Sequence, residues 1–319
     1  MVRDIGFIGL GTVGRHMAAN LLKGHYRLAV YDRHPQERED LERLGAAAAA
    51  SPFEAARGKD LVIVVLPEKE EMEAARAGEN GFLAGLAPGT VLVDMGTHSL
   101  EATLGLASEA AGRRVLFLDA PVWGTKEHAA NGLLTILVGG DPALLSRCRE
   151  AFSFFGLNVI HVGQVGDATR MKFVVNLMQA ELMQALAEGL VLGQKLGFTA
   201  EKILEVLESG GVASPLFNSK GRAIARGDFS RNLALKYVYE GLLLVKEAAE
   251  KANLQLPAAE AVRRTFEQAV RDGRGEEDFS AVIKVLWQYA RPTQASRGRA
   301  SPPRAPSLPF NFVSFQESR

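Results

Sequence analysis

Short apolar runs alternate with amphipathic segments through the first half of the chain. Runs at 4–9, 28–31, 61–66, 90–94, 115–119, 135–138 and 159–162 each have the length of a buried strand. Segments with helical spacing lie between them, among them 100–111 and 142–154. This alternation predicts a doubly wound, mostly parallel α/β sheet. Ligands of such sheets bind at the carboxyl ends of the strands, so we expect Leu66, Pro67 and Thr97 to border a ligand.

The second half of the chain shows helical periodicity only. Helices are predicted at 166–196, 199–209, 215–225, 233–252, 257–271 and 280–289. We therefore expect a sheet domain at 1–163 and an all-helical domain at 164–290. Residues 291–319 are rich in Pro, Ser and Arg and cannot form a core of their own. Phe310, Phe312 and Phe315 would anchor this tail to the chain or to a partner; a tail without fixed contacts is the alternative.

The longest predicted helix, at 166–196, contains no proline and is apolar on most of its circumference, which predicts a buried helix joining the two domains. Lys172, Asn176 and Gln179 form a narrow polar line on it, at positions i, i+4 and i+7. Apolar surroundings pull the pKa of an ammonium group toward neutrality, which makes Lys172 a candidate general acid/base. The alternative is a lysine whose stem packs and whose charged end reaches water.

A glycine-rich segment follows the first predicted strand and opens the first helix, and the second strand ends at Asp32. Its glycines would allow a tight turn, a close approach of a diphosphate and close helix–strand packing, while the helix N-terminus attracts the anion. The segment therefore predicts a dinucleotide site formed by Gly9, Leu10, Gly11, Thr12, Val13, Gly14 and Asp32. The alternative is that these glycines serve helix–strand packing alone.

Composition is that of a globular protein, with 47% hydrophobic and 23% charged residues. Lys plus Arg and Asp plus Glu are both 37, so no overall field favours nucleic acid or a membrane, and neither partner is expected. A single cysteine, Cys148, and the absence of a signal peptide or long apolar span predict a cytoplasmic location. The six histidines lack metal-ligand spacing, so no metal site is expected.

Three motifs, in order along the chain, carry a resemblance to a known family. They are GFIGLGTVGRHMAANL, DAPVWGTKEHAANGLLTILVGG at 119–140, and GDATRMKFVVN at 166–176. The first is similar to a cofactor signature, the second to a substrate-binding signature and the third to a catalytic signature. Over about residues 3–290 the chain resembles the β-hydroxyacid dehydrogenases, which include 3-hydroxyisobutyrate dehydrogenase and are related to 6-phosphogluconate dehydrogenase.

The resemblance implies hydride transfer between a small β-hydroxy acid and a nicotinamide cofactor. It implies that Lys172 takes up the proton of the substrate hydroxyl and that Asn176 holds the substrate oxygen. It also places Thr97 beside the nicotinamide. The substrate carboxylate would be bound at Val122, Trp123, Gly124 and Thr125.

The chain departs from the family pattern at two places. Trp123 replaces a serine that binds the substrate carboxylate, a role that Thr125 and Lys126 could share. Glu240 and Gly241 replace a Lys-Asp pair, and Lys236, one turn earlier, either takes over part of the cofactor contact or is a surface lysine.

These departures leave several functions open. Trp123 followed by Gly-Thr-Lys suggests the L-serine 3-dehydrogenase branch. Competing substrates are 3-hydroxyisobutyrate, 3-hydroxypropionate and, in the reducing direction, glyoxylate or succinic semialdehyde. A sensor or partner protein that binds NAD(P) without turnover is the alternative from another class. Imine reduction is disfavoured, because a retained lysine suits alcohol chemistry.

Two residues give opposing indications of the cofactor. Asp32 would accept hydrogen bonds from a ribose diol and favours NAD, whereas Arg33 could bind a 2′-phosphate and favours NADP. On these residues we give NADP a slight preference over NAD. The apolar faces of the helical domain also predict a homodimer or homotetramer.

Overall fold

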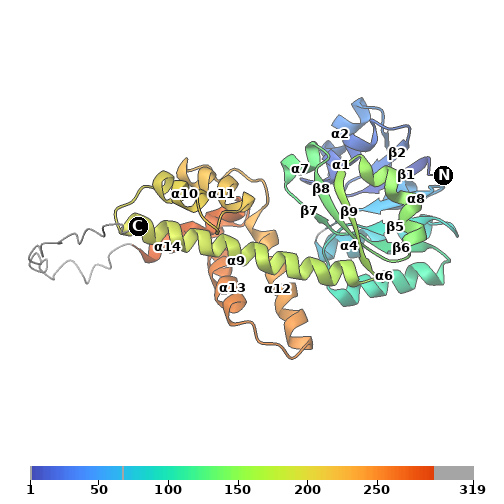
Figure 1. Ribbon diagram of the computed structural model, residues 1–319. Coiled ribbons are helices and arrows are strands. Elements are labelled where there is room, and N and C mark those ends of the chain that lie inside the picture. The colour runs from blue at the N-terminus through green and yellow to red at the C-terminus, as the bar shows by residue number, and fades with distance from the viewer. Residues whose placement is uncertain (1, 67, 291–319) are drawn as a thin grey trace, which may run out of the picture.

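A computed structural model describes residues 2–66 and 68–290. Pro67 and the segment 291–319, with the expected anchors Phe310, Phe312 and Phe315, lie outside the described residues. The chain forms a sheet flanked by helices on both faces, followed by a group of helices (Figure 1). This confirms the expected N-terminal doubly wound sheet and the all-helical second part.

The sheet has the strand order β3-β2-β1-β4-β5-β6-β8-β7, and β9 pairs with β8. Its strands are β1 Asp4–Ile8, β2 Arg27–Tyr31, β3 Ala47–Ala48, β4 Leu61–Val64, β5 Val91–Asp94, β6 Leu116–Asp119, β7 Val122–Trp123, β8 Leu134–Gly139 and β9 Gly156–Gly163. Strands β1 to β6 pair in parallel, whereas β8 runs antiparallel to β6 and β7. The sequence did not predict β3 and β7, because two residues carry no readable periodicity.

Helices of the sheet domain cover both faces of the central strands, so every residue of β4 and β5 is buried. The helices are α1 Gly14–Leu21, α2 Gln36–Arg43, α3 Pro52–Ala56, α4 Lys69–Arg76, α5 Phe82–Gly85, α6 Leu100–Gly112, α7 Lys126–Ala130 and α8 Pro142–Ser153. Side chains of Ser51, Ser99, Thr125 and Asp141 cap α3, α6, α7 and α8, respectively.

The second domain is helical throughout its described length. Its α-helices are α9 Asp167–Lys195, α10 Ala200–Glu208, α11 Pro215–Ala225, α12 Leu235–Lys251, α13 Pro257–Ala269 and α14 Ile283–Tyr289. Two predicted helices need correction at their ends. The one expected at 257–271 leaves α geometry after Ala269, in a π-helical turn where Gly273 has a φ of 77°. The one expected at 280–289 begins with a 3-10 turn, Phe279–Val282.

Helix α9 extends from the sheet to the far end of the helical domain (Figure 1). The expectation that this apolar helix is buried is met on only one of its faces in a single chain. One face is buried, but Met171, Val174 and Met178 are 43–54% exposed on the other. Helix α12 packs along α9, and Gly241 approaches Asn176 there. None of the helices within residues 2–66 and 68–290 combines the length and the hydropathy that a membrane span requires.

The start of α9 is attached to the sheet by Asp119, the last residue of β6. Its carboxylate is 1% exposed and accepts hydrogen bonds from Gly166 N at 2.9 Å, Thr169 N at 3.0 Å and Thr169 Oγ1 at 3.1 Å. The residue before the helix, Gly166, provides no side-chain cap. A carboxylate from another element therefore binds the free N–H groups of the first turn, and it fixes where Lys172 lies.

Replacing Asp119 with Ala is expected to lower the free energy of unfolding by about 3 kcal/mol, because buried N–H and hydroxyl groups lose their acceptor. The matched control is Asp141→Ala. Asp141 caps α8 at an exposed position with one bond, to Ala143 N, so this variant should lose about 1 kcal/mol. Urea denaturation measures both. Equal losses would contradict a special role for the buried carboxylate.

Candidate active site

A cleft of about 1560 Å³ lies where the carboxyl ends of the central strands face α9 and α12. Such an edge is the ligand-binding side of a doubly wound sheet. The predicted site residues that line it are Gly9, Gly11, Thr12, Val13, Gly14, Asp32, Arg33, Leu66, Thr97, Val122, Trp123, Gly124, Lys172, Asn176 and Lys236. Leu10 and Thr125 are not among its lining residues. The structure thus brings together residues that the sequence distributes over both domains.

The three glycines after β1 differ in what surrounds them. Gly9 has a φ of 97°, and a Cβ there would lie 2.3 Å from Val65 O. A Cβ on Gly14 would lie 2.1 Å from Gly9 O, so the start of α1 approaches the turn closely. At Gly11 a Cβ would meet nothing within 4 Å, and α1 has no side-chain cap. Uncapped N–H groups beside an open glycine suit the diphosphate of a dinucleotide.

The end of β2 is tied to the glycine turn by Asp32. Its carboxylate accepts hydrogen bonds from Leu10 N at 2.7 Å and from His34 N at 2.9 Å. Leu10 has a fully buried side chain, so it contributes to the turn through its backbone. The next residue, Arg33, forms an ion pair with Glu71 of α4 at 2.7 Å between Nη2 and Oε1.

Lys172 lies in the second turn of α9 and lines the cleft. Its side chain is almost completely buried, with 8% of the residue exposed, and it forms no ion pair within the described part of the chain. Burial lowers the pKa of its ammonium group to about 8. An amine with this pKa can exchange a proton near neutral pH, which is what a general acid/base requires.

Asn176 lies one helical turn after Lys172 and also lines the cleft. Its amide faces Gly241 of α12, where a Cβ would lie only 2.8 Å from Asn176 Nδ2. Any larger residue at position 241 would displace the amide or the helix. Gly241, which replaces a residue of the family pattern, therefore leaves room for the Asn176 amide in its observed position.

The predicted carboxylate-binding segment is partly strand and partly turn. Val122 and Trp123 form β7 and pair with β8, and the indole of Trp123 is 47% exposed along the cleft. Gly124 follows with a φ of 150°. The Thr125 hydroxyl lies 2.8 Å from His128 Nδ1 and caps α7. The expectation that Thr125 shares in carboxylate binding remains a prediction.

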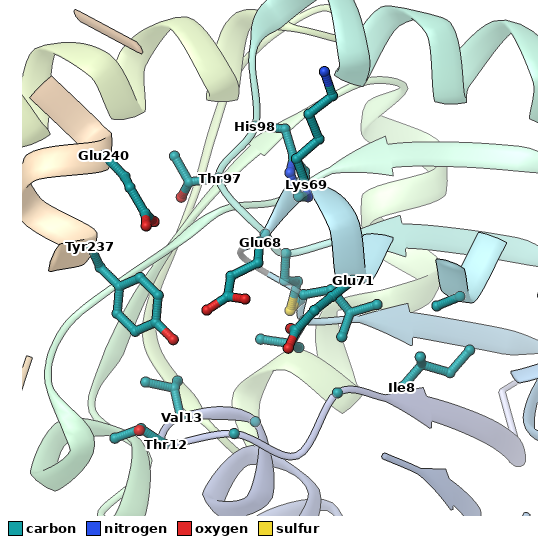
Figure 2. Close-up of a pocket in the computed structure, with 18 of the residues that line it drawn as sticks. Ile8, Thr12, Val13, Glu68, Lys69, Glu71, Thr97, His98, Tyr237 and Glu240 are labelled. Carbon is teal, nitrogen blue, oxygen red and sulfur yellow. The ribbon is translucent and has the colours of Figure 1, made fainter. Parts of the chain in front are cut away.

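Acidic residues line the cleft from two sides. Glu68 and Glu71 approach from the α4 side, and Tyr237 and Glu240 approach from α12 (Figure 2). Burial raises the pKa of Glu240, and the nearby Glu68 raises it further. Motif comparison drew attention to position 240, but it missed Glu68, Glu71 and Tyr237. Glu68 and Glu71 could have been identified from the sequence, because they follow β4 at the ligand-binding edge of the sheet.

Lys236 connects the two domains across this cleft. Its Nζ lies 3.3 Å from Glu68 Oε1 in the sheet domain and 3.0 Å from Glu276 Oε1 in the helical domain. Burial alone would lower the pKa of Lys236, but its hydrogen bonds to Glu276 and Glu68 raise it. Lys236 lines the cleft and is held there by both carboxylates. Its contact with a cofactor remains a prediction.

The fold and the cleft define a dinucleotide-dependent oxidoreductase. A family model described as the NAD binding domain of 6-phosphogluconate dehydrogenase matches residues 4–163. A second, described as NAD-binding of NADP-dependent 3-hydroxyisobutyrate dehydrogenase, matches residues 166–286. The chain belongs to the 3-hydroxyisobutyrate dehydrogenase-like family of β-hydroxyacid dehydrogenases, whose members use NAD(P) to interconvert small hydroxy acids and their carbonyl forms.

Two relatives and one solved structure are matched over nearly their full length. It is 34% identical over 296 residues to 2-(hydroxymethyl)glutarate dehydrogenase of Eubacterium barkeri, covering 92% of this chain and 98% of the relative. It is 31% identical over 283 residues to glyoxylate/succinic semialdehyde reductase 1 of Arabidopsis thaliana, with 89% and 98% covered. The structure of Mycobacterium tuberculosis 3-hydroxyisobutyrate dehydrogenase with L-serine is 28% identical, with a TM-score of 0.81 over 90% of this chain and 99% of that one.

Replacing Lys172 with Met is expected to stabilise the fold at pH 7. Below pH 8 both the folded and unfolded chains carry the proton, and the folded chain bears the full cost of burying it. That cost disappears as pH rises from about 8 to the ordinary lysine pKa of 10.5, a range in which only the unfolded chain still binds the proton. The variant should gain up to about 3 kcal/mol at pH 7 and little at pH 10.5.

Urea titrations at the two pH values measure this difference. Lys246→Met is the matched control, since Lys246 is exposed and paired with Glu250 at 2.5 Å. A gain for the Lys172 variant that is the same at both pH values would show that its ammonium group is well solvated.

Proposed function

We propose that this protein oxidises a small β-hydroxy acid with Lys172 as the general acid/base. The observation that carries the proposal is the buried amine of Lys172, which has no ionic partner among residues 2–66 and 68–290 and lies in the cleft that the glycine turn also lines. A bound nicotinamide cofactor would supply the hydride acceptor for the carbon that bears the hydroxyl. The neutral amine of Lys172 takes the hydroxyl proton, and its ammonium form returns the proton when a carbonyl is reduced.

Other residues of the cleft would orient the acid. The Asn176 amide, which has space because residue 241 is glycine, can hold the reacting oxygen one turn from Lys172. The indole N–H of Trp123 can donate one hydrogen bond to the substrate carboxylate. Backbone at Val122 and Gly124 completes this part of the cleft. Thr97 and Leu66 line its sheet side, where the nicotinamide is expected.

The charge of the cleft favours an amino-bearing substrate. Glu240 replaces a lysine of the family pattern and forms no ion pair among the described residues, and Glu68 lies close enough to raise its pKa. Lys236 pairs with Glu68 and compensates Glu240 only in part, since the pKa of Glu240 stays raised. An α-ammonium group would add to this compensation, whereas an unsubstituted hydroxy acid would not. We therefore favour L-serine, the molecule that accompanies the similar mycobacterial dehydrogenase in its structure. Its oxidation gives aminomalonate semialdehyde, which loses carbon dioxide.

The second candidate is reduction of a small aldehyde acid such as glyoxylate or succinic semialdehyde. The name of the Arabidopsis relative supports it, and Lys172 would serve as the proton donor. A chain that binds NAD(P) without turnover is the third candidate, motivated by the changes at Trp123, Glu240 and Gly241. A scan of small hydroxy acids and aldehyde acids with NAD(P) and NAD(P)H separates all three.

We also propose that a second copy of the chain covers the exposed apolar row of α9. Met171, Val174 and Met178 lie on one side of the helix, and Leu192, nearer its other end, is 61% exposed. Burying such a row removes apolar surface from water, which supports the expected homodimer or homotetramer.

Replacing Lys172 with Ala is expected to lower kcat by about 10²–10⁴-fold, the usual effect of losing a general acid/base. In the unaltered protein kcat/KM for oxidation should fall as pH drops below about 8, because the ammonium form cannot accept a proton. The variant should lack this pH dependence and still bind NAD(P). Lys246→Ala serves as the control outside the cleft. Full activity in the Lys172 variant would refute the role.

Replacing Glu240 with Gln is expected to lower kcat/KM for L-serine about tenfold, since removing one charge at short range from a cation costs on this order. The value for 3-hydroxyisobutyrate should stay within about twofold. Glu250→Gln is the matched control, on the same helix but paired with Lys246. Steady-state assays with both acids decide the matter. Equal losses for the two would show that Glu240 does not recognise an ammonium group.

A further inference from the structure

An ion pair in the same cleft joins the end of β2 to α4. Arg33 Nη2 lies 2.7 Å from Glu71 Oε1, and the two side chains are 58% and 18% exposed. Both residues line the cleft together with Asp32. Figure 2 shows the Glu71 side chain projecting from α4 into the cleft. The pair therefore belongs to the wall of the cleft, with Glu71 mostly buried and Arg33 more open to solvent.

The end of β2 is where a dinucleotide fold distinguishes NAD from NADP. An acidic residue there accepts hydrogen bonds from the ribose hydroxyls of NAD, whereas an arginine holds the 2′-phosphate of NADP. Arginine binds phosphate best with two parallel N–H groups. In this chain a carboxylate already occupies one side of the Arg33 guanidinium. Arg33 Nε also donates to His34 Nε2 at 3.0 Å, so a 2′-phosphate that bound through two N–H groups would compete with Glu71 for Nη2.

Displacing Glu71 has an electrostatic cost. Burial raises the pKa of its carboxyl group, Arg33 opposes this effect, and Glu68 and Asp32 raise the pKa further. Arg33 is thus the main compensating charge in a group of acids. Asp32 cannot move away easily, because both of its oxygens accept backbone N–H groups. A bound phosphate would take Arg33 from Glu71 and leave several negative charges together.

We propose that Glu71 selects the cofactor: by pairing with Arg33 it withholds the guanidinium from a 2′-phosphate and makes the chain prefer NAD. The slight preference for NADP drawn from the sequence compared Asp32 with Arg33 alone, because nothing in the sequence places α4 beside β2. The proposal rests on the NAD(P) chemistry of the family and is independent of the substrate and of Lys172.

The test compares nucleotide binding by calorimetry in the absence of substrate. The unaltered protein should bind NAD+ more tightly than NADP+. In Glu71→Gln the affinity for NADP+ and for the fragment 2′,5′-ADP should rise about tenfold, the scale for removing one nearby like charge. The affinity for NAD+ and 5′-AMP should change less than about twofold. Glu71→Ala should behave in the same way, and unchanged 5′-AMP binding shows that the variants are folded.

Two further variants make the test specific. Adding Arg33→Ala to Glu71→Gln should abolish the gain for NADP+, because the freed guanidinium provides it. Glu73→Gln is the matched control, since Glu73 lies on α4, pairs with Arg76 at 3.0 Å and does not line the cleft. Tighter binding of NADP+ than NAD+ by the unaltered protein would overturn the proposal. So would equal changes for both nucleotides in Glu71→Gln.

Discussion

The geometry of the cleft depends on one buried carboxylate at the junction of the two domains. Asp119 ends a strand of the sheet and binds the first turn of α9, and Thr103 supports the same contact through the Thr169 hydroxyl at 3.2 Å. The glycine turn belongs to the sheet, whereas Lys172 and Asn176 belong to the helix. A shift of the helix relative to the sheet would separate the two halves of the site, so this contact sets the distance between them.

The two departures from the family pattern have different physical consequences. At position 241 the loss of a side chain makes space, because Asn176 occupies the volume that a Cβ would need. At position 240 the change reverses the charge of a cleft wall, next to Glu68 and the phenol of Tyr237. Gly241 preserves the placement of Asn176 on α9, whereas Glu240 alters the charge that the cleft attracts. Family membership alone therefore does not define the charge that a substrate should carry.

Local patterns predicted those parts of the structure that depend on consecutive residues. The glycine turn, the strand ends and the polar line on α9 could all be recognised, because spacing alone determines them. The pairs Arg33–Glu71 and Lys236–Glu276 could not, since each joins elements whose packing the sequence does not reveal. The exposed side of α9 was missed for the same reason: an apolar helix looks buried until its neighbours are placed. The cap that the Thr125 hydroxyl forms on α7 was also not predicted, and its contact with a ligand remains a prediction.

The ionic bridge formed by Lys236 also affects how ligands would enter and leave the cleft. Its ammonium group contacts Glu68 of the sheet domain and Glu276 of the helical domain, so it forms an ionic bridge between the two domains beside the cleft. The three side chains are about one third to two thirds exposed, so dissolved salt can screen the ionic bridge. Rising ionic strength would weaken this contact between the two domains without altering the buried hydrogen bonds between Asp119 and the start of α9. Ligand entry and release would then depend on the salt concentration, whereas the positions of the reacting groups would not.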